Sequence, residues 1–291
     1  MFHGSMVALV TPMTSDGRVD YPALERLVEW QVAEGTEAII ANATTGESAT
    51  LEVREQLEVL EHCLKATSGR IPVIAGTGSN STAHAVELTR LAEGHGASGA
   101  LVVVPYYNKP TQEGLYRHFC SVAAAVQLPV ILYNVPSRTV TDLLPETTAR
   151  LAQVANIVAI KDATGKLERV PELRQLCGSE FSLLSGDDAS AAGFMLRGGQ
   201  GVISVTANVV PRLVRALCAA VRGGQTAAAE ALVTKLAPLN RCLFLESNPI
   251  PVKWALTQMQ RIPAGIRLPL TPLAAEHQAA LGNALAALAL I

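Results

Sequence analysis

A lysine at the end of an apolar run is the residue of this chain whose position most needs a chemical explanation. In "NIVAIKDATG", residues 157–160 have the pattern of a buried strand, and Lys161 follows them directly. A lysine at a strand end can extend its ammonium group into solvent. If it points into a closed barrel instead, burial disfavours the charged form of an amine, and a neutral amine attacks carbonyl carbon. Lys161 is therefore a candidate for Schiff-base chemistry.

Schiff-base formation also needs groups that move protons, and hydroxyl side chains end several other apolar runs. These are Thr44 and Thr45 in "ANATTGES", Tyr106 and Tyr107 in "VVVPYYN", and Tyr133 in "PVILYN". If the runs are the strands of a barrel, their carboxyl ends meet on one face, where such enzymes keep their active sites. The hydroxyls and Lys161 would then surround a common pocket.

Each of these positions also has a purely structural interpretation. Thr44 and Glu47 have the spacing of a capping box at the start of a helix, although such a helix start could also bind a carboxylate through its N–H groups. Tyr106 and Tyr107 could be packing aromatics. Arg138, in "LYNVPSRT", could be a solvated loop residue or a bidentate clamp for a carboxylate.

The elements that must position these residues follow a regular alternation. Short apolar runs, typical of parallel strands covered on both faces, occupy 5–10, 37–42, 71–76, 99–104, 129–134, 156–161, 181–186 and 201–206. Helical patterns follow at 20–35, 50–66, 82–93, 112–126, 145–153, 167–177, 189–197 and 210–222. Eight repeats predict an α/β fold, a (β/α)₈ TIM barrel, although an open doubly wound sheet has the same local signals.

The chain beyond the eighth repeat contains helical patterns only. We therefore predict a barrel domain at 1–223 and a C-terminal helical appendage, packed on the barrel, at 224–291. In the first helical pattern we expect Asp20 as the N-cap and Gly35 as the stop. In the second, a stripe of apolar residues predicts the buried face: Val53, Leu57, Leu60 and Leu64.

Composition excludes several classes of function. The chain has 291 residues, 49% hydrophobic and 16% charged, with a net charge of −2 and no basic run, so neither nucleic acid nor an anionic membrane is an expected partner. The opening residues lack a signal peptide, and no apolar run approaches the roughly 18–20 residues of a membrane span. Five widely spaced cysteines favour a cytoplasmic location, and neither they nor the six histidines have metal-ligand spacing.

Together the motifs resemble those of the dihydrodipicolinate synthase family, from about residue 2 to about residue 272. The matching segments are "GSMVALVTPM", "TTGESATL", "RIPVIAGTGSNST", "PYYNKPTQEGLY", "ILYNVPSRT", "LLSGDDASA", "GVISVTANV" and "ESNPIPVKWAL". The resemblance implies condensation of pyruvate with L-aspartate 4-semialdehyde to 4-hydroxy-tetrahydrodipicolinate, the step that opens diaminopimelate and lysine biosynthesis. It also implies a barrel without metal or organic cofactor, usually a homotetramer built as a dimer of dimers.

The resemblance assigns roles by position. Lys161 would form the Schiff base with pyruvate. A proton relay would consist of Tyr133, Thr44 and, from a neighbouring subunit, Tyr107. The substrate-binding groups would be Thr45 for the pyruvate carboxylate, Arg138 for the carboxylate of the semialdehyde, and the backbone of Gly186 and Ile203.

Three departures from the family pattern stand out. Ala43 replaces a common Gly, and Asp162 replaces a frequent Glu. The third concerns the site at which some members bind lysine as an inhibitor. This chain keeps four of its residues, Ser48, Ala49, Asn80 and Tyr106, but has Gln56 for His, His84 for Glu and Val53 for a polar residue. Loss of the carboxylate at 84 would weaken lysine binding by roughly 10- to 150-fold, so we expect weak or absent feedback.

Two alternatives remain open at this point. A sister aldolase on the same barrel, such as an N-acetylneuraminate lyase or a 2-keto-3-deoxy sugar acid aldolase, would keep the lysine, the tyrosine and a loop like "TTGE". Arg138 and the pair Tyr106–Tyr107 argue against it. A catalytically silent barrel, used for regulation or assembly, is the other alternative, and the complete set of site residues argues against that.

Overall fold

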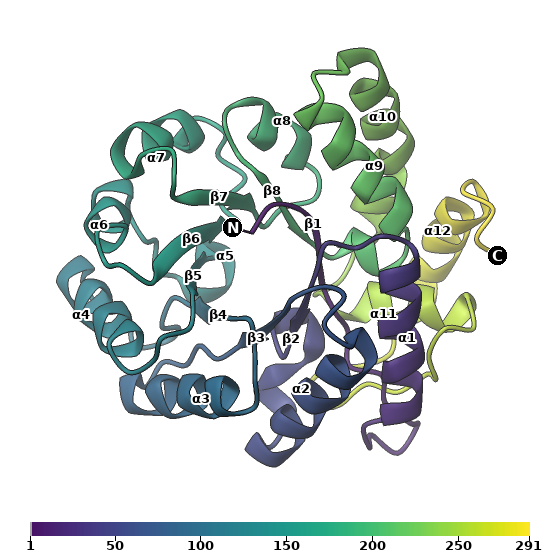
Figure 1. Cartoon of the computed structure of the whole chain (residues 1–291). Coiled ribbons are helices and arrows are strands. Elements are labelled where there is room, and N and C mark those ends of the chain that lie inside the picture. Colours follow the sequence, from purple (N-terminus) through teal and green to yellow (C-terminus); the bar gives the residue numbers. More distant parts are fainter. Residues whose placement is uncertain (1) are drawn as a thin grey trace.

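The chain forms a closed barrel of eight parallel strands (Figure 1). The structure is a computed structural model that describes residues 2–291. The strands are β1 (Gly4–Ala8), β2 (Ala38–Ala41), β3 (Val73–Gly76), β4 (Gly99–Val103), β5 (Val130–Asn134), β6 (Ile157–Asp162), β7 (Ser182–Ser185) and β8 (Gly201–Ser204). The barrel closes between β1 and β8, where Met6 lies opposite Ile203. This pairing confirms the TIM barrel and excludes the open doubly wound sheet.

Helices cover the outside of the barrel in the predicted order (Figure 1). They are α1 (Tyr21–Ala33), α2 (Val53–Thr67), α3 (Thr82–Gly94), α4 (Gln112–Ala123), α6 (Pro145–Leu151), α7 (Arg169–Cys177), α8 (Ala191–Leu196) and α9 (Pro211–Arg222). One further short helix, α5 (Pro136–Thr139), follows β5 where we expected a loop. Three 3₁₀ turns follow β2 and β8: η1 (Thr44–Gly46), η2 (Ser48–Thr50) and η3 (Thr206–Asn208).

The predicted ends of α1 are confirmed. Asp20 is the N-cap, and its carboxylate accepts a hydrogen bond from the N–H of Ala23 at 2.9 Å. Gly35 lies just beyond the C-cap with φ +86°, in the left-handed region that glycine adopts without strain.

The predicted apolar face of α2 is only partly right. Leu60 is buried, but the other three members of the stripe are half-buried. The helix buries Val59, Cys63 and Ala66 with Leu60 instead. These residues also have helical spacing, so the face that meets the barrel is rotated by about one residue from the one the leucines suggested.

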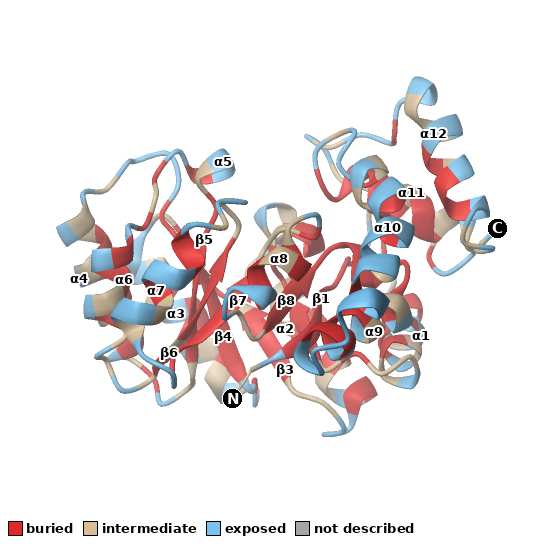
Figure 2. Cartoon of the chain, turned by 90° about the horizontal axis from the view of Figure 1, so that it is seen from above, coloured by how far each residue is buried: buried red, intermediate tan, exposed pale blue. Residues whose placement is uncertain are grey.

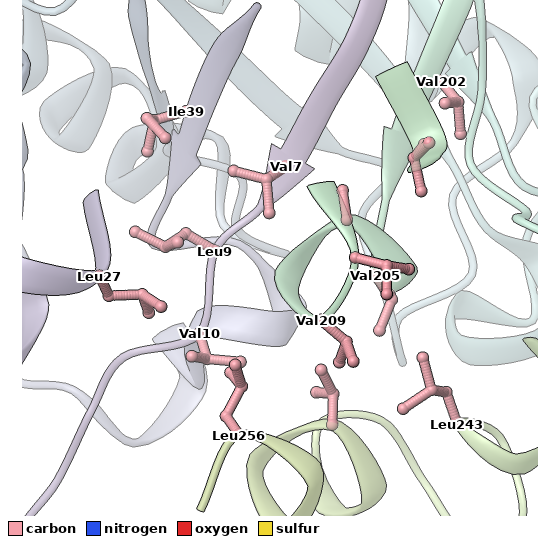
Figure 3. Packing of buried hydrophobic residues seen from close by; sticks show 14 of the residues in the cluster. Val7, Leu9, Val10, Leu27, Ile39, Val202, Val205, Val209, Leu243 and Leu256 are labelled. Carbon is pink, nitrogen blue, oxygen red and sulfur yellow. The ribbon is translucent and has the colours of Figure 1, made fainter. Parts of the chain in front are cut away.

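The core has an inner and an outer layer. Inside the barrel, alternate strand residues such as Met6, Ile74, Ile131 and Ile203 form one buried cluster. The opposite faces of the strands pack against the surrounding helices. Figure 3 shows part of this outer layer, where buried residues of strands β1, β2 and β8 meet residues of the C-terminal helices. Its labelled side chains are Val7, Leu9, Val10, Leu27, Ile39, Val202, Val205, Val209, Leu243 and Leu256.

Three helices follow the barrel: α10 (Thr226–Cys242), α11 (Ile250–Gln258) and α12 (Ala275–Ala286). Helix α10 packs against α9 and α12, and α11 packs against η3. Figure 2 shows α11 and α12 on the same side of the barrel as α5, which follows the carboxyl end of β5. We propose the division between residues 223 and 224 because α9 ends at Arg222 and α10 starts at Thr226. Across residues 2–291, no helix is long and apolar enough to cross a membrane.

Candidate active site

Lys161 lies inside the barrel against Tyr133. The two residues are register partners on the neighbouring strands β6 and β5. The Lys161 Nζ atom lies 4.2 Å from the centre of the Tyr133 ring, and Lys161 is 5% exposed. Since Tyr133 belongs to the cluster that fills the barrel interior, the amine sits among apolar side chains and one aromatic face. The structure therefore places Lys161 away from bulk water.

Gly186 makes room for the lysine stem. It follows β7, the strand beside β6, and a Cβ atom at this position would lie 3.0 Å from Lys161 Cε and 2.7 Å from Ala163 Cβ. A side chain at this position would therefore require Ala163 to move and the Lys161 stem to shift slightly. Ile203, on β8, is buried in the interior cluster that also contains Tyr133.

A cavity of about 620 Å³ opens at the carboxyl ends of the strands. Thr44, Tyr133, Arg138 and Asn248 all contribute to its wall. Because Tyr133 both lines the cavity and contacts Lys161, the cavity reaches to within one side chain of the amine. Its volume suits a small-molecule site.

The paired threonines lie in the 3₁₀ turn η1, and the capping-box interpretation of Thr44 with Glu47 is wrong. Thr44 does not cap a helix, and α2 instead begins with a capping box between Glu52 and Glu55. Glu47 has a left-handed backbone with φ +57°. Its carboxylate does not bond within the threonine turn. It accepts hydrogen bonds from two residues that are distant in sequence.

Those partners come from the C-terminal region. The buried ammonium group of Lys253, on α11, donates to the Glu47 carboxylate. The N–H of Arg267 donates to the other carboxylate oxygen at 3.1 Å. Burial lowers the pKa of Lys253, and the charge of Glu47 opposes that shift. This ion pair joins the threonine turn to the C-terminal helices.

Asn248 joins two of the predicted substrate-binding residues. Its Nδ2 atom donates to Thr45 Oγ1 at 2.9 Å, and its backbone carbonyl accepts from Arg138 Nη2 at 3.0 Å. Arg138 lies on α5 at the mouth of the cavity, and its remaining donors leave it free to bind an anion. We did not single out Asn248 from the sequence, although it lies in the conspicuous segment "ESNPIPVKWAL". Only the folded structure shows that Asn248 contacts the threonine turn and Arg138.

The structure does not bring Tyr107 to the other site residues. Its backbone has φ +75° and its side chain is 88% exposed, directed away from the barrel interior of the same chain. The adjacent Tyr106 is 39% exposed and does line the cavity. A relay role for Tyr107 therefore requires a second copy of the chain.

Four of the five predicted effector residues line the same cavity. Ser48, Ala49 and His84 line it with Tyr106, and the substituted positions Val53 and Gln56 do so as well. His84 Nδ1 lies 3.7 Å from the carboxylate of Glu87, one turn further along α3. Asn80 does not line the cavity, and its backbone carbonyl accepts a hydrogen bond from Asn108 Nδ2 at 2.8 Å.

Comparison with known proteins decides the family. The model of the dihydrodipicolinate synthetase family matches residues 1–288, nearly the whole chain. The chain belongs to the dihydrodipicolinate synthetase family. It is accordingly an enzyme, a lyase.

Relatives within the dihydrodipicolinate synthetase family are similar along nearly their full length. A 4-hydroxy-tetrahydrodipicolinate synthase of Methylococcus capsulatus is 58% identical over 285 residues, 98% of each chain. One from Pseudomonas savastanoi is 59% identical over 271 residues, 93% of each chain. The crystal structure of the chloride-inhibited dihydrodipicolinate synthase from Acinetobacter baumannii, complexed with pyruvate, covers 100% of both chains at 50% identity with a TM-score of 0.98.

Proposed function

We propose that this enzyme condenses pyruvate with L-aspartate 4-semialdehyde through a Schiff base on Lys161, giving 4-hydroxy-tetrahydrodipicolinate. The observation that carries the proposal is the burial of Lys161 against Tyr133, a residue that lines a cavity of small-molecule size. Among residues 2–291, no carboxylate lies within ion-pair distance of the Lys161 amine. The amine is therefore not held in an ion pair that an incoming ketone would have to break.

In the first half-reaction, the neutral Lys161 amine attacks the keto carbon of pyruvate. The carbinolamine then loses water, and this step needs a proton on the departing oxygen. Tyr133 and Thr44, which line the same cavity, supply and receive protons in this step. Tyr107 of a neighbouring subunit completes the relay, which is consistent with its exposure in the single chain.

In the second half-reaction, the iminium group acts as an electron sink. The pyruvate methyl group loses a proton and becomes an enamine carbon, which attacks the aldehyde of the semialdehyde. The amine of the condensed product then displaces Lys161 as the ring closes, so the enzyme regains its free lysine. The product therefore contains all the atoms of the two substrates except those of the one water molecule that is lost when the imine forms.

The two substrate carboxylates need separate positive or donor groups. Thr45 and the N–H groups of its turn hold the pyruvate carboxylate, close to the barrel axis. Arg138 holds the carboxylate of the semialdehyde at the cavity mouth, where a guanidinium group can bind it in a bidentate manner. The backbone of Gly186 and Ile203 completes the wall near Lys161. Asn248 bonds to both Thr45 and Arg138, which supports the assignment of the two residues to one site.

The assembly and its regulation form part of the same proposal. A homotetramer built as a dimer of dimers would bring Tyr107 into the neighbouring site. The place of the reaction is the opening of diaminopimelate and lysine biosynthesis, in the cytoplasm. Lysine feedback would be weak or absent, because His84 and Gln56 line the effector part of the cavity.

Mass spectrometry after borohydride reduction tests the central step. The enzyme reduced in the presence of pyruvate should carry a stable adduct on Lys161, and a Lys161→Arg variant should carry none. The untreated enzyme should then be assayed for turnover of pyruvate with L-aspartate 4-semialdehyde and, separately, for cleavage of sugar acids. Failure to trap pyruvate at Lys161 would refute the proposal, and faster cleavage of sugar acids would favour a sister aldolase.

A further inference from the structure

A network of hydrogen-bonded polar side chains lies on the outer side of strands β5 and β6, next to Tyr133 and Lys161 in sequence. Its side chains are Asn134 at the end of β5, Asp162 at the end of β6, Asp142 in the segment after α5, and Arg169 at the start of α7. Three of the four are buried, and Asp142 is partly exposed.

Arg169 makes three contacts with the other parts of the network. Its Nε atom donates to Asp162 Oδ2 at 3.2 Å, and its Nη1 atom donates to Asp142 Oδ2 at 3.0 Å. Its Nη2 atom donates to the backbone carbonyl of Leu143 at 2.8 Å. The rigid guanidinium plane can meet three acceptors in fixed directions, which an ammonium group on a flexible stem does not do.

Asn134 closes the network from the other strand. Its Nδ2 atom donates to Asp142 Oδ1 at 2.7 Å, and its Oδ1 atom accepts from the N–H of Leu143 at 2.9 Å. The network thus ties together three separate segments: the ends of β5 and β6, and the segment that follows α5.

Each of these segments carries or closely follows a residue of the proposed reaction. Asn134 directly follows Tyr133, and Asp162 directly follows Lys161; the two pairs are in register across the β5–β6 ladder. Because successive side chains on a strand point to opposite faces, Tyr133 and Lys161 face the barrel interior while the next residues face outward. Arg138 lies on α5, four residues before Asp142.

We propose that Arg169 is a positioning residue, which holds Tyr133, Lys161 and Arg138 in their relative places through this network. The inference rests on the proposed function for the roles of those three residues. Arg169 does not touch the cavity, so it acts only through the backbone of the segments it connects. A displacement of about 1 Å at reacting groups can lower a rate by roughly 100-fold, so support of this kind has a measurable effect.

The substitution Arg169→Lys is the suitable test. Complete removal of the positive charge would leave two neighbouring carboxylates without a cation and could prevent folding. A lysine keeps the charge but cannot reach Asp162, Asp142 and the Leu143 carbonyl together. The variant should fold, with a loosened connection between β5 and β6.

Arg174→Lys provides a matched control on the same helix. Arg174 Nη1 donates to the carbonyl of Phe181 at 2.9 Å, and its Nη2 atom donates to that of Gly198 at 3.0 Å. These acceptors precede β7 and β8, at the amino ends of the strands and away from the cavity. The control therefore loses a similar set of hydrogen bonds at the opposite end of the barrel.

For Arg169→Lys we expect kcat and the rate of borohydride trapping of pyruvate at Lys161 to fall by roughly 10- to 100-fold, with KM for pyruvate changed less. Arg174→Lys should lower Tm and leave both rates within about twofold of the wild type. Equal rates for the two variants, after correction for the folded fraction, would overturn the proposal.

A crystal structure of Arg169→Lys gives a readout independent of the substrates. We expect the Tyr133 ring and Lys161 Nζ to move apart from their 4.2 Å contact. An unchanged contact would overturn the positioning role even if the wild type failed to trap pyruvate, and that failure would refute the proposed function separately.

Discussion

The amide of Asn248 donates a 2.9 Å hydrogen bond to the hydroxyl of Thr45, across 203 positions of sequence. The bond is buried, and it places a residue of the C-terminal segment against the turn that we propose to hold the pyruvate carboxylate. The backbone carbonyl of Asn248 meanwhile holds Arg138. One residue thus connects both of the proposed carboxylate-binding groups to the C-terminal helices.

We predict that Asn248→Ala raises KM for pyruvate by roughly 5- to 10-fold, since a typical hydrogen bond contributes about 1 kcal/mol. KM for the semialdehyde should change little, because Arg138 bonds to the backbone carbonyl, which alanine retains. Steady-state kinetics with each substrate varied in turn measure both values. In a Thr45→Ala background the substitution should have almost no further effect; an undiminished effect there would show that Asn248 does not act through Thr45.

The buried pair Glu47–Lys253 leads to a prediction about stability. Lys253→Met should lower the free energy of unfolding by about 3–5 kcal/mol, because it leaves the buried Glu47 carboxylate without its cation. The double variant Glu47→Gln/Lys253→Met should recover most of that loss. Urea denaturation measures the three proteins, and a double variant no more stable than the single one would contradict the explanation.

Gly186 provides a test of the space around the nucleophile. Gly186→Ala should slow the trapping of pyruvate by about 10-fold, because the new Cβ would displace Ala163 and shift the Lys161 stem. Gly94→Ala is the control: this α3 glycine has open space around it, and alanine should stabilise the helix by about 0.5–1 kcal/mol without affecting trapping. Normal trapping by the Gly186 variant would mean that the lysine stem has more freedom than the structure indicates.

His118 predicts how stability depends on pH. It is 5% exposed, and burial lowers its pKa to about 4 from an ordinary value near 6.5. The folded state therefore favours the neutral ring. The contribution of His118 to the free energy of unfolding is complete above pH 6.5, and it is lost progressively as the pH falls from 6.5 through 4. At pH 5 the loss should be about 2 kcal/mol.

His118→Gln should remove this part of the acid sensitivity. Glutamine can keep a hydrogen bond to Thr82 Oγ1, which lies 2.9 Å from His118 Nδ1, but it does not titrate. Thermal unfolding of both proteins between pH 7 and pH 5 measures the difference. Parallel pH dependence for the two proteins would rule out His118 as the source.

The effector part of the cavity carries a prediction about inhibition. Lysine should inhibit the wild type little at ordinary cellular levels. His84→Glu should lower the inhibitory concentration by about 10-fold or more, since it adds a carboxylate to the wall of the cavity that Tyr106 also lines. Assays over a lysine titration measure this. Strong inhibition of the wild type would contradict the role assigned to position 84.

The sequence by itself determined the strand–helix alternation, because hydrophobic periodicity is a local property. The same local order determined that Lys161 and Tyr133 end neighbouring strands, and capping chemistry determined the ends of α1. Only the tertiary structure decided that the barrel closes between β1 and β8, and that Asn248 and Lys253 return to the threonine turn. It also turned Glu47 away from Thr44 and Tyr107 away from the barrel interior. These outcomes depend on contacts between residues far apart in the chain. Local residue spacing does not indicate which distant residue will pair with a buried polar group.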